Sequence, residues 1–202
     1  MGDEARQHPI GVYDSGVGGL TVVRWLREIL PKEQIIYFGD TARVPYGGRP
    51  PEEIIEFSHQ ILAFFRERGV KFVIAACNTS SALALPVVAP RSPIPMMGVI
   101  KAGARRAFEV TKNDRVGVIG TKAMVESHAY VHALEDLEPS ITVYEEACPK
   151  LVPLIEAGEW EGDLVREPLR EYLTPLVRQD VDTLILGCTH YPFLLPSKKS
   201  IA

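Results

Sequence analysis

The segments FVIAACNT at residues 72–79 and TLILGCTH at residues 183–190 decide the fold. Each begins with a short run of apolar residues, continues through a small residue to a cysteine, and ends in polar side chains. A continuous apolar run of this length is typical of a strand buried on both faces of a parallel sheet. Polar residues directly after such a strand mark the carboxyl edge of the sheet, where open α/β proteins bind their ligands.

Other short apolar runs alternate with longer segments of helical period along the whole chain. The clearest helix is predicted between Pro51 and Gly69, because four apolar residues fall on one face: Ile54, Phe57, Ile61 and Phe65. This alternation predicts an α/β protein with parallel sheets of the Rossmann-like or flavodoxin-like kind. The predicted strands cover residues 10–13, 35–38, 72–76, 116–119, 141–144 and 183–186.

The two halves of the chain resemble each other at an offset just above a hundred residues. The motif at residues 77–79 corresponds to that at 188–190, and the turn at 14–16 corresponds to Gly120-Thr121. We therefore expect two similar α/β domains, at residues 1–98 and 99–202, with the active site between them. A loose boundary is predicted near residues 95–101, after a proline-rich stretch.

Composition excludes several classes of protein. The chain has 202 residues, of which 46% are apolar, and a formal net charge of −4. It carries no run of basic residues, so we expect no nucleic-acid partner. No apolar stretch reaches the length of a membrane span, and no signal peptide is recognisable, which predicts a cytoplasmic protein. Three widely spaced cysteines, an odd number, predict free thiols.

A glycine-rich turn, DSGVGG at residues 14–19, follows the first predicted strand. Such a loop lets a ligand approach the backbone closely. A dinucleotide-binding loop is one alternative, with Asp40 near the position of its ribose-binding acid, but Thr21 breaks the required glycine pattern. A turn that serves only the sheet-to-helix geometry is the other alternative.

The two cysteines at matching strand ends indicate acid–base chemistry. A single buried cysteine is usually a core residue, whereas Cys77 and Cys188 occupy equivalent positions in two similar halves. Each is expected at the start of a helix, which lowers the pKa of a thiol. Inverting a stereocentre by proton transfer needs a base on one face of the carbon and an acid on the other, and two facing thiols would supply both. Asp14 and His190 are the expected proton-handling neighbours.

The motifs at residues 14–19, 45–47, 76–79 and 187–192 resemble the signature segments of glutamate racemases, within the aspartate/glutamate racemase superfamily. The resemblance implies interconversion of L- and D-glutamate without pyridoxal phosphate or metal, supplying D-glutamate for peptidoglycan. It implies that Cys188 takes the proton from L-glutamate and Cys77 from D-glutamate, with Asp14, His190 and Glu156 assisting. It further implies a substrate site made of Asp14, Ser15, Pro45, Tyr46, Gly47, Asn78, Thr79, Thr121, Thr189 and His190, and commonly a homodimer.

Glutamate racemases continue beyond the motif at 187–192 through a further helix and strand. The sequence therefore predicts a first domain that lacks its C-terminal completion, exposed apolar surface, and impaired activity. Two other functions stay open: a metal-dependent hydrolase that uses Cys77, Cys188 and His190 as ligands, and an inactive glutamate-binding relative. His128 and His132 are expected on a solvated helical face, Cys148 is expected to be structural, and His59 is expected at the surface.

Overall fold

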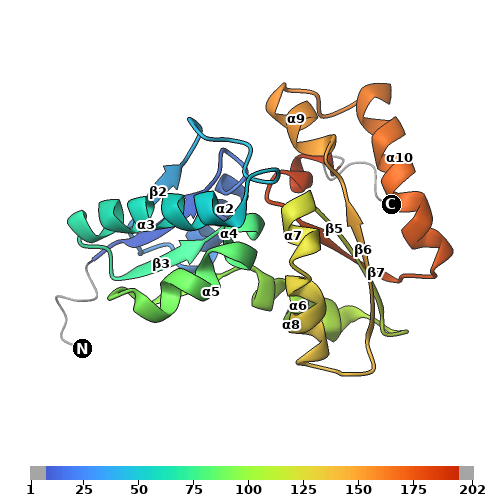
Figure 1. The fold of residues 1–202 in the computed structure, drawn as a ribbon, viewed down its shortest axis with the longest axis horizontal. Helices are drawn as coiled ribbons and strands as arrows, with labels where there is room; N and C mark the ends of the chain where they lie inside the picture. The colour runs from blue at the N-terminus through green and yellow to red at the C-terminus, as the bar shows by residue number, and fades with distance from the viewer. Residues whose placement is uncertain (1–7, 196–202) are drawn as a thin grey trace. The chain divides into compact units, whose positions relative to one another are not determined.

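The computed structural model describes residues 8–195, and the chain divides between Ile100 and Lys101 into two compact units (Figure 1). Unit 1 ends at Ile100 and unit 2 begins at Lys101. Each unit has one parallel sheet with helices packed on it. The predicted α/β class with two parallel-sheet domains is therefore confirmed.

Unit 1 has a four-stranded sheet in the order β2-β1-β3-β4, in which every neighbouring pair is parallel. Because β1 lies between β2 and β3, the carboxyl ends of these three strands meet at one edge of the sheet. The strands are β1 (Ile10–Asp14), β2 (Ile35–Gly39), β3 (Phe72–Ala75) and β4 (Met96–Gly98). The helices are α2 (Leu20–Ile29), α3 (Pro51–Glu67), α4 (Asn78–Leu83), α5 (Leu85–Val88) and the 3-10 turn η1 (Ala89–Arg91).

Side chains of β1 point alternately to the two faces of the sheet, so unit 1 has one hydrophobic layer on each face. Tyr13 points to the α3 side and packs in a cluster with Ile61 and Phe65. Val12 points the other way and packs in a cluster with Val22 and Leu26 of α2. Successive residues of a strand face opposite sides of the sheet, so a single strand anchors both helices.

The helix predicted from residues 51–69 is confirmed as α3 (Pro51–Glu67). Pro51 occupies its first turn together with Glu52 and Glu53, and Arg66 lies in its last turn. These charges complement the helix dipole, and proline at the first position costs no hydrogen bond. Gly69 follows with φ of +63°, the left-handed conformation that ends many helices.

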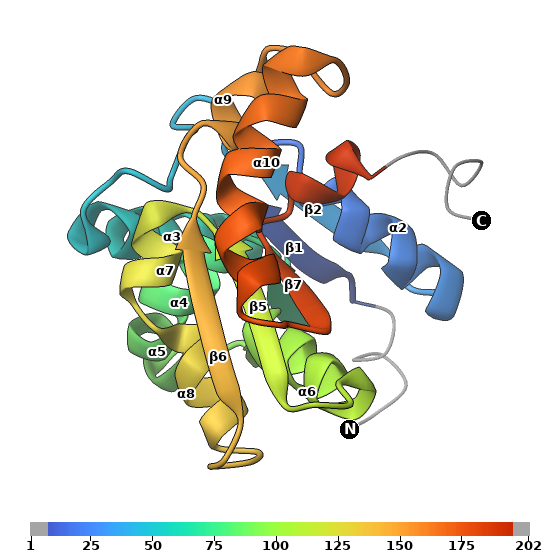
Figure 2. The same ribbon diagram turned by 90° about the vertical axis from the view of Figure 1, so that its right-hand side faces the viewer.

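Unit 2 has a three-stranded parallel sheet in the order β6-β5-β7 (Figure 2). Tyr172 and Leu176 of its longest helix pack in a buried cluster with Ile119 of β5 and with Leu151 and Ile155. The strands are β5 (Arg115–Gly120), β6 (Thr142–Ala147) and β7 (Thr183–Gly187). The helices are α6 (Ile100–Val110, which begins at the boundary), α7 (Lys122–Glu126), α8 (Ala129–Glu135), α9 (Leu151–Glu156), α10 (Asp163–Arg178) and the 3-10 turn η2 (Tyr191–Leu194).

Three details differ from the sequence predictions. Strand β4 (Met96–Gly98) lies inside the stretch expected to be a loose boundary. Strand β6 runs three residues further than predicted, to Ala147. The helix expected to carry both His128 and His132 begins only at Ala129, because His128 adopts a left-handed conformation with φ of +52° and precedes it.

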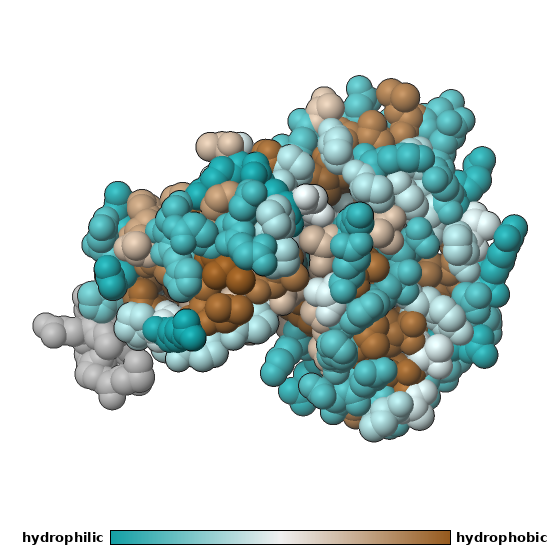
Figure 3. Space-filling model, viewed as in Figure 1, coloured by the Kyte–Doolittle hydropathy of each residue, from teal (hydrophilic) through white to brown (hydrophobic). Residues whose placement is uncertain are grey.

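Some apolar side chains reach the surface, and Figure 3 shows them in groups between hydrophilic residues. In unit 1, α2 has no fully buried residue, and Trp25 and Ile29 are 65% and 68% exposed. In unit 2, Trp160 is half-exposed and stacks on the ring of Phe193, with centroids 5.8 Å apart. Among the described residues, no helix combines the length and the apolar character needed to cross a bilayer.

The start of β7 is tied to the segment before β5 through one carboxylate. Asp182 accepts hydrogen bonds from the Lys112 amide at 2.6 Å, the Thr111 hydroxyl at 2.7 Å and the Asn113 amide at 3.0 Å. Backbone donation from Lys112, followed by the Thr111 hydroxyl, lowers the pKa of Asp182 to about 2. Hydrogen bonds to the ionised form favour that form, so folding is coupled to ionisation here.

We expect Asp182→Asn to lower the melting temperature at neutral pH. The pKa of Asp182 is lower in the folded chain than the ordinary value of about 3.9. The contribution of its carboxylate to the free energy of unfolding is therefore present above pH ~4 and is lost as the pH falls toward ~2. The difference from the parent chain should therefore shrink over that window, as measured by circular dichroism. The control Asp136→Asn removes an exposed carboxylate and should lower the melting temperature less than Asp182→Asn at neutral pH. An effect of Asp182→Asn that does not change with pH would contradict the assignment.

Candidate active site

The chemistry-bearing residues lie at the carboxyl ends of the strands in both units. In unit 1, Asp14 ends β1, and Cys77 follows β3 directly before α4. In unit 2, Thr121 follows β5, and Cys188 follows β7. Each cysteine follows the strand that comes third in the chain within its unit. In both sheets this strand lies beside the first one, because the spatial order begins second, first, third.

Cys77 is buried, with 5% of its surface exposed, and packs in a cluster with Tyr46, Ile54 and Ala84. Burial raises the pKa of its thiol, and the carboxylate of Asp14 raises it further. The expectation that the helix N-terminus would lower this pKa is therefore wrong. Removing a thiolate from water outweighs the dipole of a six-residue helix, so the thiol of Cys77 rests in its protonated form.

Ser80 is a neighbour of Cys77 that the sequence interpretation did not single out. Its hydroxyl oxygen is fully buried and, apart from the Cys77 thiol, has no hydrogen-bond partner within residues 8–195. Hydrogen bonds from Ser80 and Ser15 act to lower the pKa of Cys77, against the larger effect of burial. The Ser80 hydroxyl is thus a donor available to the thiolate. The signal in the sequence was its place three residues after the cysteine, within the first turn of α4.

The loop after β1 fixes the carboxylate of Asp14. Asp14 is fully buried, and its Oδ2 accepts a hydrogen bond from the Gly16 amide at 3.0 Å. The Tyr37 hydroxyl donates to the Gly16 carbonyl at 2.6 Å. A Cβ atom on Gly19 would lie 2.5 Å from the Cβ of Asp14, so only glycine permits this approach. The glycine-rich turn therefore positions an acid as well as shaping the backbone.

Unit 2 aligns a thiol, an imidazole and a carboxylate. Cys188 Sγ lies 3.7 Å from Nδ1 of His190, and Nε2 of His190 lies 2.5 Å from Oε1 of Glu156 at the end of α9. His190 is almost fully buried, and the Glu156 side chain is 29% exposed. When the Glu156 carboxylate accepts a hydrogen bond from Nε2–H, Nδ1 can accept a proton from the thiol.

The remaining predicted binding residues are divided between the two units. Thr121 caps α7, and its hydroxyl accepts a hydrogen bond from the Met124 amide at 3.3 Å. Thr189 directly follows Cys188 and is buried. In unit 1, Pro45 is exposed and Gly47 half-buried, whereas Ser15, Tyr46, Asn78 and Thr79 are buried.

Other candidates have structural environments. Cys148 is buried in the unit 2 core, and burial raises its pKa to about 12. His128 pairs with Glu145 at 2.7 Å, and His59 is exposed on α3. The part of the chain that the structure describes has no group of three or more His, Cys, Asp or Glu side chains placed to hold a metal ion.

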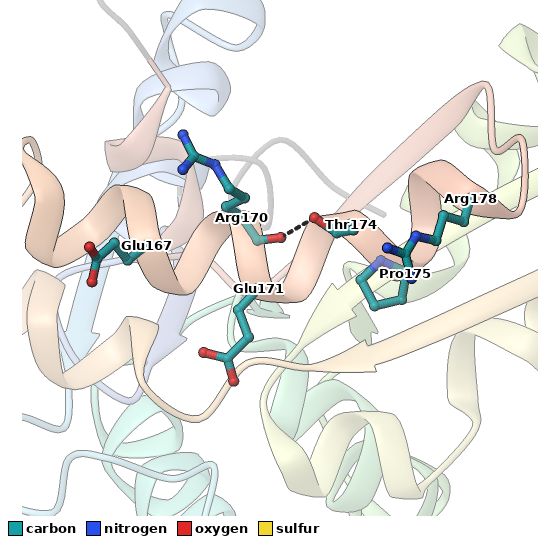
Figure 4. A pocket seen from close by; sticks show the side chains of 6 residues that line it. All are labelled: Glu167, Arg170, Glu171, Thr174, Pro175 and Arg178. Atoms are coloured by element: carbon teal, nitrogen blue, oxygen red, sulfur yellow. Dashed lines mark hydrogen bonds between the residues drawn. The ribbon is translucent and has the colours of Figure 1, made fainter.

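A surface groove on unit 2 lacks the features of a reactive site. The side chains that line it all project from one helix, α10 (Figure 4). Inside the helix, the Thr174 hydroxyl donates to the Arg170 carbonyl at 2.6 Å. The groove contains no thiol or imidazole, so the strand ends remain the candidate site.

Comparisons with known proteins identify the family of the chain. A family model described as Asp/Glu/Hydantoin racemase matches residues 20–200. Glutamate racemase from Gloeobacter violaceus is 51% identical over 187 residues, which make up 93% of this chain and 70% of that protein. Glutamate racemase from Syntrophus aciditrophicus is 50% identical over 195 residues, with 96% of this chain and 72% of that protein covered.

Solved structures of glutamate racemases also match the chain. The crystal structure of glutamate racemase from Francisella tularensis in complex with D-glutamate has a TM-score of 0.88 and 43% identity, and the match covers 94% of this chain and 71% of that one. The chain therefore belongs to the Asp/Glu/hydantoin racemase family and is an isomerase that acts on amino acids.

Proposed function

We propose that the chain interconverts L- and D-glutamate by transferring protons at the α-carbon between two thiols, without a cofactor. The observation that carries the proposal is the Cys188–His190–Glu156 alignment in unit 2, together with Cys77 beside Asp14 at the equivalent strand end in unit 1. Relatives about half identical to this chain are glutamate racemases, and one solved relative binds D-glutamate.

In the direction from L- to D-glutamate, Cys188 acts as the base. Its proton moves to Nδ1 of His190, and the carboxylate of Glu156 stabilises the imidazolium that forms. The thiolate then removes the α-proton, and the electron pair of the broken C–H bond stays on the carbon, delocalised into the α-carboxylate. His190, held by Glu156, is thus a base within reach of the thiol.

Cys77 acts as the acid in the same direction. Burial and Asp14 keep it protonated, so a thiol is ready to give its proton to the other face of the carbanion. The thiolate left on Cys77 is stabilised by donation from the Ser80 hydroxyl, which has no other partner within residues 8–195. In the reverse direction the two thiols exchange roles, with Asp14 beside Cys77 to take up its proton.

Substrate binding is proposed for the polar residues around the two thiols. Their hydroxyl, amide and backbone groups can hold both carboxylates and the amino group, which fixes the α-carbon for proton transfer. The assigned residues are Ser15, Pro45, Tyr46, Gly47, Asn78 and Thr79 in unit 1, and Thr121, Thr189 and His190 in unit 2.

We further propose that the enzyme acts in the cytoplasm as a homodimer and supplies D-glutamate for peptidoglycan. This proposal is supported by the family resemblance and by the similarity of the chain to glutamate racemases.

The decisive test is proton NMR of L-glutamate incubated with the protein in heavy water that contains a chelator. Proton transfer through a thiol must exchange solvent deuterium into the α-position, so the α-proton signal should disappear while D-glutamate accumulates. Exchange that stops on chelation would favour a metal-dependent enzyme. Glutamate binding by folded protein without exchange would favour a non-catalytic binding protein and overturn the proposal.

A further inference from the structure

The segment between β2 and α3, residues 40–50, contains no helix or strand but is held in one shape by side chains. It carries Tyr46, one of the proposed substrate-binding residues. Backbone hydrogen bonds are few: the Arg43 amide donates to the Asp40 carbonyl and the Arg49 amide to the Tyr46 carbonyl, each at 3.0 Å. The shape of this segment therefore depends on what its side chains bind.

Asp40 is the centre of these contacts. It is buried, with 5% exposed, and its Oδ2 both accepts a hydrogen bond from the Tyr46 hydroxyl and pairs with Nε of Arg43 at 2.6 Å. Its own amide donates to the Asp14 carbonyl at 3.0 Å. One residue thus connects the end of β1, which carries the reactive acid, to the middle of the loop. Charge-assisted hydrogen bonds of this kind are the strong ones in proteins.

Arg43 and Arg49 fasten the same loop to α3. The guanidinium of Arg43 lies 4.1 Å from the ring centroid of Phe57, and its NH1 donates to Gln60 Oε1 at 2.6 Å. Arg49 donates from Nε to the Arg43 carbonyl at 2.9 Å and pairs with Glu53 at 2.8 Å. Since Asp40 is the carboxylate that neutralises Arg43 inside the loop, its removal leaves a charged group in a half-buried position.

Tyr46 links this network to the reactive thiol. Its ring is 1% exposed and packs in the cluster that contains Cys77 and Ile54. Burial, and then the hydrogen bond to Asp40, raises the pKa of Tyr46 well above its ordinary value. The hydroxyl therefore stays protonated and keeps donating to Asp40, which fixes the ring against Cys77.

We propose that Asp40 is a positioning residue for glutamate: through Tyr46 and Arg43 it holds residues 41–49 in the shape that binds substrate beside Cys77. This inference rests on the proposed function. Asp40 takes no proton from substrate in this scheme, since its carboxylate is occupied by Tyr46 and Arg43.

The test compares Asp40→Ala, Asp40→Asn and Tyr46→Phe in the full chain. Asp40→Ala should raise KM for both enantiomers by about ten- to hundredfold, with a smaller change in kcat, because a mispositioned loop weakens substrate binding. Asparagine keeps an acceptor for Tyr46, so Asp40→Asn should recover part of the loss. The double variant Asp40→Ala/Tyr46→Phe should be no worse than Asp40→Ala, because residues that act as a unit are not additive.

The matched control is Glu33→Ala, which breaks the 2.5 Å ion pair with Lys71 at the opposite, amino-terminal end of the same sheet. It removes a partly buried carboxylate from unit 1 and should leave KM unchanged. If the parent chain racemises glutamate and Asp40→Ala keeps the parental KM, or if Glu33→Ala raises KM equally, the inference is overturned and the proposed function stands.

Hydrogen–deuterium exchange separates the inference from the proposed function. Asp40→Ala should speed exchange in residues 41–49, and Glu33→Ala should not. If the parent chain neither binds nor exchanges glutamate, the proposed function fails, and these exchange rates alone decide whether Asp40 holds the loop. Equal rates of amide exchange at residues 41–49 in the parent chain and in Asp40→Ala would overturn the inference.

Discussion

Replacing Cys188 with serine is expected to lower the rate of glutamate racemisation by about 10³-fold, and replacing Cys77 with serine should have a comparable effect. A serine hydroxyl is far less acidic than a thiol, so it can neither serve as the base nor donate its proton as readily. Each variant keeps one working thiol. Cys77→Ser should therefore still exchange the α-proton of L-glutamate, and Cys188→Ser that of D-glutamate, with almost no inversion in either case.

The measurement is NMR in heavy water for exchange, combined with polarimetry for inversion, on each enantiomer separately. Cys148→Ser is the matched control, because this third cysteine is buried in the unit 2 core and has no assigned part in the reaction. Should one thiol variant retain parental racemisation, a single base would serve both faces of the carbon, and the two-thiol mechanism would be wrong.

Phe65→Ala is expected to destabilise the protein by about 3–5 kcal/mol, the usual cost of emptying a buried aromatic site. The Phe65 side chain is fully buried between the sheet and α3 and contacts the rings of Tyr13, Phe38 and Phe64. A Cβ atom added to Gly11 would lie only 3.0 Å from this ring. The ring therefore packs directly on the backbone of β1.

Chemical denaturation followed by far-ultraviolet circular dichroism would measure this loss. Trp25→Ala, at a 65% exposed position of the same unit, should change the free energy of unfolding by no more than about 0.5 kcal/mol. Equal losses in the two variants would show that the α3 layer is not the main source of stability in unit 1.

Much of the fold could be predicted because parallel strands buried on both faces leave continuous apolar runs. The first two strands and α3 lie where the hydrophobic pattern placed them. Strand β4 could not be recognised, since Met96–Gly98 is only three residues long, follows a proline and contains no β-branched residue. Its pairing with Val73 and Ala75 is a tertiary contact that no local pattern reports.

The candidate site was predictable as residue types but not as an electrostatic environment. The sequence shows that Cys77 precedes a helix, but not that the thiol is buried and lies close enough to Asp14 for the carboxylate to raise its pKa. Nor does it show that Glu156, at the end of α9, reaches the imidazole of His190, 34 residues further along the chain. Asp40 resembled a ribose-binding acid by position, whereas its partners in the structure are Arg43 and Tyr46.

The matching strand orders of the two units bear on stereochemistry. The faces of an α-carbon are mirror images, but two sheets built from L-amino acids can be related only by rotation, never by reflection. A repeated half-site therefore cannot treat the two enantiomers identically. The two thiols do have different partners: a carboxylate and hydroxyls at Cys77, and an imidazole–carboxylate pair at Cys188. Because enantiomers have equal free energies, kcat/KM must be the same in both directions, and the asymmetry of the site can appear only in kcat and KM taken separately.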